Sequence, residues 1–233
     1  ECGSLRIRYF GAGTQQIESA LVSLFPKVRT ARWDADTAST HEAHEAIWSR
    51  FVERRADVLI GTQMIAKGLD LPLVTLVGMV SADVGLYLPD FRAGERTFQV
   101  LMQVAGRAGR GLLGGRAVLQ TYQPEHYVIR AAAAHDYDGF FAREIAYRRE
   151  MGYPPFRRMV RVLFQGGNDA RAQAEADRAA DLLRARLERL RLTDTQIIGP
   201  APCFFQRINN VFRWHLLLRG PNPALVLDGF DPP

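Results

Sequence analysis

Cysteine and lysine are scarce in this sequence of 233 residues. Cys2 and Cys203 are the only cysteines, too few for a disulfide framework. Lys27 and Lys67 are the only lysines among 30 basic residues. The glycine-rich turn 11–14 lacks the Gly-Lys-Ser/Thr ending of a phosphate-binding loop, so it predicts a strand-to-helix turn.

Long hydrophobic runs are also missing. No stretch approaches the length of a membrane span, and the first residues do not resemble a secretory signal. Hydrophobic residues make up 47% and charged residues 24%, which is typical of a globular protein with a real core. We therefore expect a cytoplasmic protein with no membrane partner.

The formal net charge is +5, and nearly all of the positive charge is arginine. Guanidinium groups bind phosphate through two hydrogen bonds and stack on bases, which favours nucleic acid or nucleotide phosphates as ligands. A genomic preference for arginine over lysine explains the same composition. The net charge alone does not distinguish a phosphate-binding function from this genomic preference.

The first half of the sequence alternates apolar strands with amphipathic helices. This order predicts an α/β lobe with a parallel sheet and right-handed crossovers. The predicted strands are 5–10, 28–34, 57–61, 73–80 and 116–122, and the predicted helices are 15–24, 41–54 and 93–107.

The second half has a different character, mostly helical at 131–134 and 137–151. Two prolines in 152–156 cannot continue a helix, and we place a boundary there. Strands at 159–164, 196–199 and 212–219 and a long helix at 169–192 then predict a small α+β domain, which we expect to be incomplete at its end.

The strongest local signal is the segment from Gln103 to Arg110. Arg107 and Arg110 follow a helix and are separated by glycine, so both guanidinium groups can face one anion, such as a transferring phosphoryl group. The alternative is an Arg-Gly turn at a helix C-terminus, where cations are favourable anyway.

A second motif follows the predicted strand 57–61. Thr62 and Gln63 can bind a phosphate backbone without reading bases, and Gly68 and Asp70 place an acidic group beyond a short helix. Taken alone, Thr-Gln is equally a helix cap. Together the two motifs resemble the fifth and sixth signatures of superfamily-2 helicases.

Longer segments make the resemblance specific. Residues 80–101, 106–110, 152–156 and 212–219 are similar to hallmark segments of the primosomal protein N-prime (PriA) family of replication-restart helicases. His215 departs from the glutamine usual in that family and receives no role. The resemblance covers essentially the whole chain. It implies a RecA-like second helicase lobe followed by a small α+β C-terminal domain, divided as 1–4 (zinc-module remnant), 5–122, 123–156 (helical linker) and 157–233.

The resemblance also implies roles at the nucleotide. Arg107 and Arg110 would act as arginine fingers on ATP, accompanied by Mg²⁺, that is held by the first lobe of the motor. Gly68 and Asp70 would complete the cleft, and Gln103 would couple the cleft to motion. Because the phosphate-binding lobe is not in this sequence, we expect the chain alone to hydrolyse no ATP.

The implied DNA contacts lie in both halves. Thr62 and Gln63 would touch the DNA backbone, and the C-terminal domain would bind forked and single-stranded DNA and the single-strand-binding protein. Primosome or helicase-loader proteins are the further implied partners. Arg207 and Arg213 are our weaker nominations, beside Phe204-Phe205, which we expect in the core unless they stack on bases.

Cys2 receives an explanation from the same family. Its members carry an eight-cysteine module that binds two Zn²⁺ ions, and the last cysteine precedes a Gly-Ser and then a Gly-x-Gly-Thr segment. Cys2 matches that exit, so we expect the chain to begin within the module and to hold one ligand of an incomplete site. Cys203 is expected to be a small buried residue.

Two alternatives remain open. A fork-reversal translocase shares the motor motifs, but should lack the segment from Leu88 to Arg92. A non-catalytic DNA- or protein-binding module with relic motor motifs belongs to a different class. A phosphate loop in the upstream reading frame would favour the motor.

Overall fold

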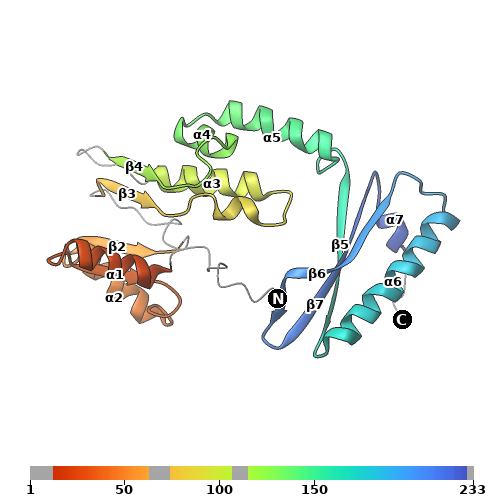
Figure 1. The fold of residues 1–233 in the computed structure, drawn as a ribbon, viewed down its shortest axis with the longest axis horizontal. Helices are drawn as coiled ribbons and strands as arrows, with labels where there is room; N and C mark the ends of the chain where they lie inside the picture. Colours follow the sequence, from red (N-terminus) through yellow and green to blue (C-terminus); the bar gives the residue numbers. More distant parts are fainter. Residues whose placement is uncertain (1–12, 63–73, 107–114, 230–233) are drawn as a thin grey trace. The chain divides into compact units, whose positions relative to one another are not determined.

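The computed structural model describes residues 13–62, 74–106 and 115–229. The chain divides into two compact units (Figure 1). The first unit comprises Glu1–Tyr87 and Arg92–Phe140, and the second comprises Leu88–Phe91 and Phe141–Pro233. A short segment ahead of residue 92 therefore belongs to the second unit, although both of its chain neighbours belong to the first.

The first unit contains short strands that alternate with helices. In chain order they are α1 (Thr14–Leu24), β1 (Thr30–Trp33), α2 (His41–Val52), β2 (Val58–Gly61), β3 (Leu76–Met79), the 3-10 helix η2 (Val84–Tyr87), α3 (Ala93–Ala105), β4 (Arg116–Leu119) and α4 (Tyr127–Ala133). Helix α5 (Tyr137–Met151) continues into the second unit.

Both strand pairs of the first unit are parallel. β1 pairs with β2, with Trp33 opposite Gly61, and β3 pairs with β4, with Met79 opposite Leu119. Each pair is joined through a helix, α2 in the first case and α3 in the second, because parallel strands need a long crossover. The α/β class with parallel strands is confirmed. The strand expected at 5–10 lies outside the described residues.

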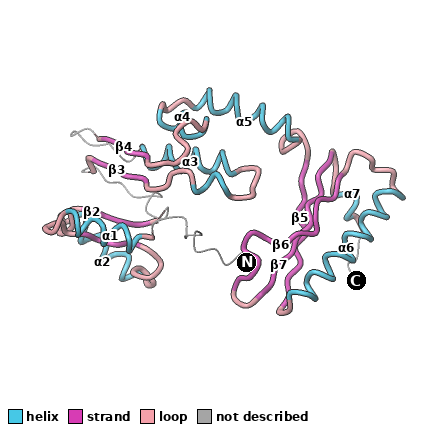
Figure 2. The backbone as a smooth tube through the Cα atoms, in the orientation of Figure 1, coloured by secondary structure: helices cyan, strands magenta, loops and turns pink. Residues whose placement is uncertain are grey.

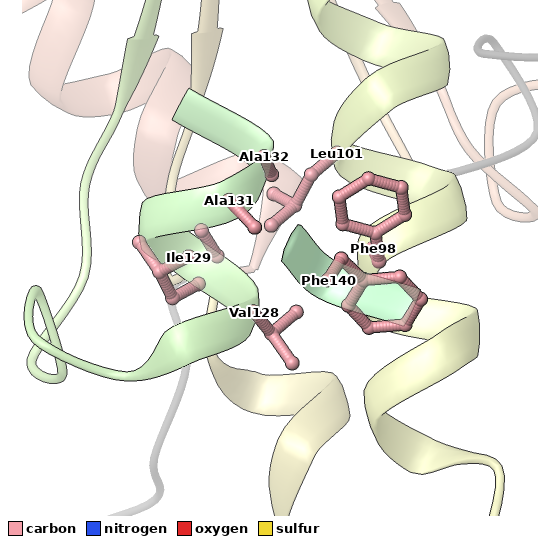
Figure 3. Packing of buried hydrophobic residues seen from close by; sticks show 8 residues of the cluster. Phe98, Leu101, Val128, Ile129, Ala131, Ala132 and Phe140 are labelled. Carbon is pink, nitrogen blue, oxygen red and sulfur yellow. The ribbon is translucent and has the colours of Figure 1, made fainter. Parts of the chain in front are cut away.

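The packed core of the first unit lies where α3 meets α4 and the start of α5. Phe98 and Phe140 stack with their ring centroids 4.1 Å apart. Leu101 is 1% exposed and Val128 is fully buried (Figure 3). Because Phe98 and Leu101 are three residues apart, both project from one face of α3, and that face orients the helix.

The second unit is a three-stranded antiparallel sheet with one long helix (Figure 2). Its elements are β5 (Arg158–Gly166), α6 (Asp169–Arg189), β6 (Gln196–Ile208), β7 (Val211–Gly220) and α7 (Ala224–Leu227). β7 is the central strand, between β5 and β6. Asn209 and Asn210 both have positive φ, 49° and 64°, as a two-residue hairpin turn requires.

Alanine explains how α6 packs on the sheet. Asn168 caps the helix by accepting a hydrogen bond from the Arg171 backbone N–H at 3.0 Å. The buried positions share a helical spacing and small size: Ala172, Ala176, Ala179, Ala180 and Leu183. Three of them, Ala179, Ala180 and Leu183, share a buried cluster with Leu216 and Leu218 of β7. Small side chains let the helix lie close to the sheet, and most charged residues of α6 are exposed, with Arg171 and Glu175 paired at 3.3 Å.

The structure differs from the sequence-based expectation mainly in element lengths. β6 runs to Ile208, because the strand continues through two register shifts after the expected end at 199. α4 begins at Tyr127 rather than at 131, since the His126 side chain caps it at the Val128 N–H. Helix α7 was not predicted. In the described part of the chain, no helix is long and apolar enough to cross a membrane.

Candidate functional site

Thr62 lies at the carboxyl edge of the β1–β2 pair. It is the residue after β2 and is exposed. Because Trp33 is opposite Gly61, the residue that follows β1, Asp34, emerges at the same edge. The carboxyl edge of parallel strands is where α/β proteins bind ligands. Gln63, which we expected beside Thr62, lies outside the described residues.

A hydrogen-bonded cluster around Asp34 occupies this edge. The Thr14 hydroxyl donates to Asp34 Oδ2 at 2.5 Å, which holds the first residue of α1 against the end of β1. The backbone N–H groups of Asp36 and Thr37 donate to Asp34 Oδ1 at 3.1 and 2.9 Å. Gly13 caps α1 with no side-chain hydrogen bond. The start of α1 therefore lies beside Asp34, and its N-cap residue Gly13 has no side chain with which to accept a hydrogen bond from the first backbone N–H groups.

The carboxyl group of Asp34 is held ionised by this cluster. The hydrogen bond from Thr14 lowers the pKa of Asp34 to about 2, against the opposing effect of burial; Thr37 and the guanidinium of Arg32 act in the same direction as Thr14. Arg32 Nε lies 3.1 Å from Asp34 Oδ2. The ionised carboxylate of Asp34 is therefore stabilised within the edge by donated hydrogen bonds, and the guanidinium of Arg32 balances its charge.

Gln103 is exposed near the end of α3. The helix ends at Ala105, with Gly106 as its C-cap. Because Phe98 and Leu101 are buried on the other side, the exposed position of Gln103 follows from the amphipathic pattern of the helix. Arg107 and Arg110 follow directly in sequence and lie outside the described residues, as do Gly68 and Asp70.

The β6–β7 hairpin exposes an aromatic pair. Phe204 and Phe205 are 61% and 62% exposed, with ring centroids 5.0 Å apart in an edge-to-face arrangement. Our expectation that they belong to the core is wrong. They lie within the register shift of β6 between Pro202 and Arg207, where its alternation against β7 is interrupted.

Arg207 lies three residues further along the same hairpin. Its guanidinium carbon is 5.1 Å from the centre of the Phe212 ring, and its Nη2 donates to Asn210 Oδ1 at 2.8 Å. The side chain is exposed but held in one orientation by both contacts. The sequence from 196 to 220 contains three arginines and no acidic residue. The hairpin is therefore a basic aromatic surface.

Arg213 lies on β7 and is partly buried, with an Nε that has no hydrogen-bond partner. His215, on the same face, has its Nδ1 3.3 Å from the sulfur of Cys203, and Arg161 donates to that sulfur at 3.1 Å. Burial lowers the pKa of His215, and the charge of Arg161 adds to the effect. Cys203 is 5% exposed, which confirms the expected small buried residue.

Net charge is concentrated in the second half of the chain. Residues 1–140 carry 15 basic and 15 acidic side chains, whereas residues 141–233 carry 15 and 10. The entire excess of +5 thus belongs to the part that contains the β6–β7 hairpin. Phosphate ligands are attracted to such a surface.

No zinc site can be built from the described residues. They contain no group of three or more histidine, cysteine or acidic side chains that could hold a metal ion. Cys2 lies outside the described part of the chain. A structural zinc needs four ligands, so no zinc chemistry is derived for this chain.

Two features of the molecule escaped sequence reasoning. The Asp34 cluster was missed, although Asp34-Ala35-Asp36-Thr37 directly after a strand is a recognisable turn pattern in which a carboxylate accepts nearby backbone N–H groups. Phe91 was read only as part of a family segment. Its contacts with Arg148 and Tyr153 are tertiary and leave no local signal.

Comparison with known proteins finds a family match for each half of the chain. Residues 6–111 match the helicase conserved C-terminal domain, and residues 149–227 match the primosomal protein N C-terminal domain. The chain is 45% identical to replication restart protein PriA of Bacillus subtilis over 94% of its own length, and 41% identical to that of Synechocystis over 97%. The chain belongs to the PriA family.

The PriA protein of Haemophilus influenzae is 37% identical over 95% of the chain. The chain spans only 27% to 30% of the length of these three relatives. The two matched domains follow in the expected order, the helicase conserved C-terminal domain before the primosomal protein N C-terminal domain. Neither the fork-reversal translocase nor the non-catalytic module is favoured by these matches.

Proposed function

We propose that this chain supplies the second motor lobe and the C-terminal domain of an ATP-dependent 3′-to-5′ DNA helicase that recognises stalled or recombined forks and starts primosome assembly. The observation that carries the proposal is the exposure of Gln103 on α3, the helix that leads directly into the Arg107/Arg110 pair. An exposed end of α3 is available to a ligand held by another lobe.

At the nucleotide, Arg107 and Arg110 would face the γ-phosphate of ATP. Gly68 and Asp70 would complete this side of the nucleotide cleft. Gln103 would couple the cleft to the movement of the motor. ATP with Mg²⁺, when bound by the other lobe, supplies the phosphoryl group whose transfer to water drives the motor. Arginine contributes to such a reaction by meeting the charge that develops on the transferring group.

Along the DNA, Thr62 and Gln63 would bind backbone phosphates at the carboxyl edge of the β1–β2 pair. Two features of that edge support the proposal. Thr62 is exposed, and the N-terminus of α1, whose N-cap residue Gly13 offers no side-chain acceptor, begins beside Asp34. Backbone N–H groups at a helix start favour phosphate oxygens, and they read no sequence.

In the C-terminal domain, Arg207, Arg213 and the Phe204-Phe205 pair would bind unpaired DNA. Exposed aromatic rings beside arginine are typical of surfaces on which bases stack while the backbone is held by charge. The hairpin carries no acidic side chain to repel phosphate. The single-strand-binding protein and a primosome or helicase-loader protein complete the proposed partners, and Zn²⁺ belongs to the proposed full-length protein through Cys2.

The experiment is a comparison of DNA-stimulated ATP hydrolysis in the full-length protein and in its Arg107→Ala variant. We expect turnover to fall about 10³-fold or more, with nucleotide affinity changed much less, because an arginine finger acts mainly on the transition state. Arg55→Ala, an exposed arginine after α2, is the matched control and should leave turnover unchanged. Undiminished hydrolysis in Arg107→Ala would refute the assignment.

A further inference from the structure

Residues Leu88–Phe91 cross out of the first compact unit and back into it. The chain up to Tyr87 and from Arg92 belongs to the first unit, whereas these four residues belong to the second. The crossing falls between η2 and α3, and α3 begins two residues after Phe91. A contact that fixes the position of Phe91 therefore also restrains the N-terminal end of α3, which is only two peptide bonds away.

Phe91 is held by two side chains of the second unit. Its ring centroid lies 5.9 Å from that of Tyr153 at an interplanar angle of 39°, and the guanidinium carbon of Arg148 lies 5.3 Å from the ring centre. Arg148 is itself fixed by a nearly buried ion pair, with its Nε 2.8 Å from Glu144. An aromatic ring between a second ring and a paired guanidinium is a specific contact.

Tyr153 continues the contact into the sheet. The guanidinium carbon of Arg219, on β7, lies 5.9 Å from the Tyr153 ring centre. Arg219 donates one hydrogen bond to the Met151 carbonyl and another to Gln196 Oε1, both at 2.8 Å. Phe91 is therefore connected, contact by contact, to β7 and to the first residue of β6.

We propose that Phe91, Arg148 and Tyr153 form a clamp that couples the C-terminal domain to α3, and through α3 to the nucleotide-facing residues that follow it. The proposal rests on the proposed motor function. Helix α3 is a rigid element of 13 residues with a buried face, so a change at its start is transmitted to its end near Gln103. In this proposal the clamp residues position α3 and are not catalytic residues.

The test uses Phe91→Leu and Tyr153→Leu, which keep an apolar side chain and remove the ring contact, separately and combined. In this chain, hydrogen exchange of the first hydrogen-bonded backbone amides of α3, from Arg96 onward, should become about three- to tenfold faster in either variant, since an aromatic pair is worth that factor. The double variant should be no faster than the singles. Phe25→Leu, an exposed phenylalanine after α1, is the control.

In the full-length protein, the same variants should reduce DNA unwound per ATP hydrolysed several-fold, while basal hydrolysis and DNA affinity stay within twofold of the wild type. Unchanged exchange in α3, or additive effects in the double variant, would overturn the clamp. If the wild-type protein shows no DNA-stimulated hydrolysis while the exchange result holds, the proposed motor fails and the physical clamp stands. Wild-type unwinding efficiency in both variants would overturn the coupling.

Discussion

At the scale of single residues, Asp34 connects three parts of the β1–β2 edge. It accepts from Thr14 on α1 and from the backbone of the turn that follows β1. Its lowered pKa means that the ionised form is favoured in the folded protein. The contribution to stability is therefore present above the ordinary carboxyl range and is lost as the pH falls toward 2.

We expect Asp34→Asn to lower the melting temperature by roughly 5 °C at pH 7, because the charged acceptor is lost. The difference from the wild type should shrink as the pH is lowered from about 4 to 2, because wild-type Asp34 is increasingly protonated as the pH approaches its pKa of about 2. Thermal melting across this range measures both effects. Asp36→Asn, an exposed neighbour, is the control, and a deficit that persists at pH 2 would contradict the electrostatic explanation.

His215 offers a second titration with a different window. Burial and Arg161 lower its pKa, so the folded protein resists protonation and the unfolded chain takes up the proton first. The wild type should therefore lose stability as the pH falls below about 6.5, the ordinary range of histidine. His215→Gln should flatten the melting temperature between pH 7 and 5. His41→Gln, on the exposed first turn of α2, should leave the wild-type slope in place.

At the scale of elements, the β6–β7 hairpin combines a basic charge with exposed rings. Replacing both phenylalanines, Phe204→Ala with Phe205→Ala, should weaken binding of single-stranded DNA by about tenfold or more, because each stacked base contributes roughly 1–3 kcal/mol. Binding of blunt duplex DNA should change less, since its bases are already stacked. Fluorescence anisotropy with the two DNAs measures the difference.

The matched control is Tyr147→Ala. Tyr147 lies on α5, is 45% exposed and also belongs to an aromatic pair. Thermal melting should be nearly unchanged in the hairpin variant, because exposed side chains contribute little to the folded state. Equal losses on single-stranded and duplex DNA would indicate an electrostatic contact and exclude stacking.

At the scale of the whole molecule, the proposed function makes this chain one of the two lobes between which ATP is bound. We expect the purified chain to hydrolyse no ATP above background, with or without DNA, because Arg107 has no phosphate-holding lobe to act on. Adding the first lobe as a separate polypeptide should restore measurable DNA-stimulated hydrolysis. ATP hydrolysis by the chain alone that is lost in Arg107→Ala would contradict the prediction that hydrolysis requires the first lobe.

Much of this arrangement could be predicted from sequence because local chemistry determines it. The β1–β2 and β3–β4 units follow from apolar runs separated by amphipathic helices, and Asn168 marks the start of α6 as a cap. The end of β6 could not be predicted, since its register shifts depend on pairing with β7. The exposure of Phe204 and Phe205 was misjudged for the same reason.

The membership of Leu88–Phe91 in the second unit was equally beyond reach of sequence patterns. It depends on partners more than fifty residues away, and nothing within the segment itself indicates them. Family resemblance identified those residues as a hallmark but gave no physical reason. The contacts with Arg148 and Tyr153 supply one.

The outer strands of the C-terminal sheet have a consequence for handling the protein. A sheet of three strands has two open margins, which in many proteins recruit other chains and precipitate. Here β6 carries Pro200 and Pro202 and two register shifts, and β5 carries Arg158 and Arg161. Proline withholds a donor and arginine repels its own copies, so neither margin is a good template for an added strand. The exposed rings of the β6–β7 hairpin thus lie in a sheet whose margins disfavour self-association.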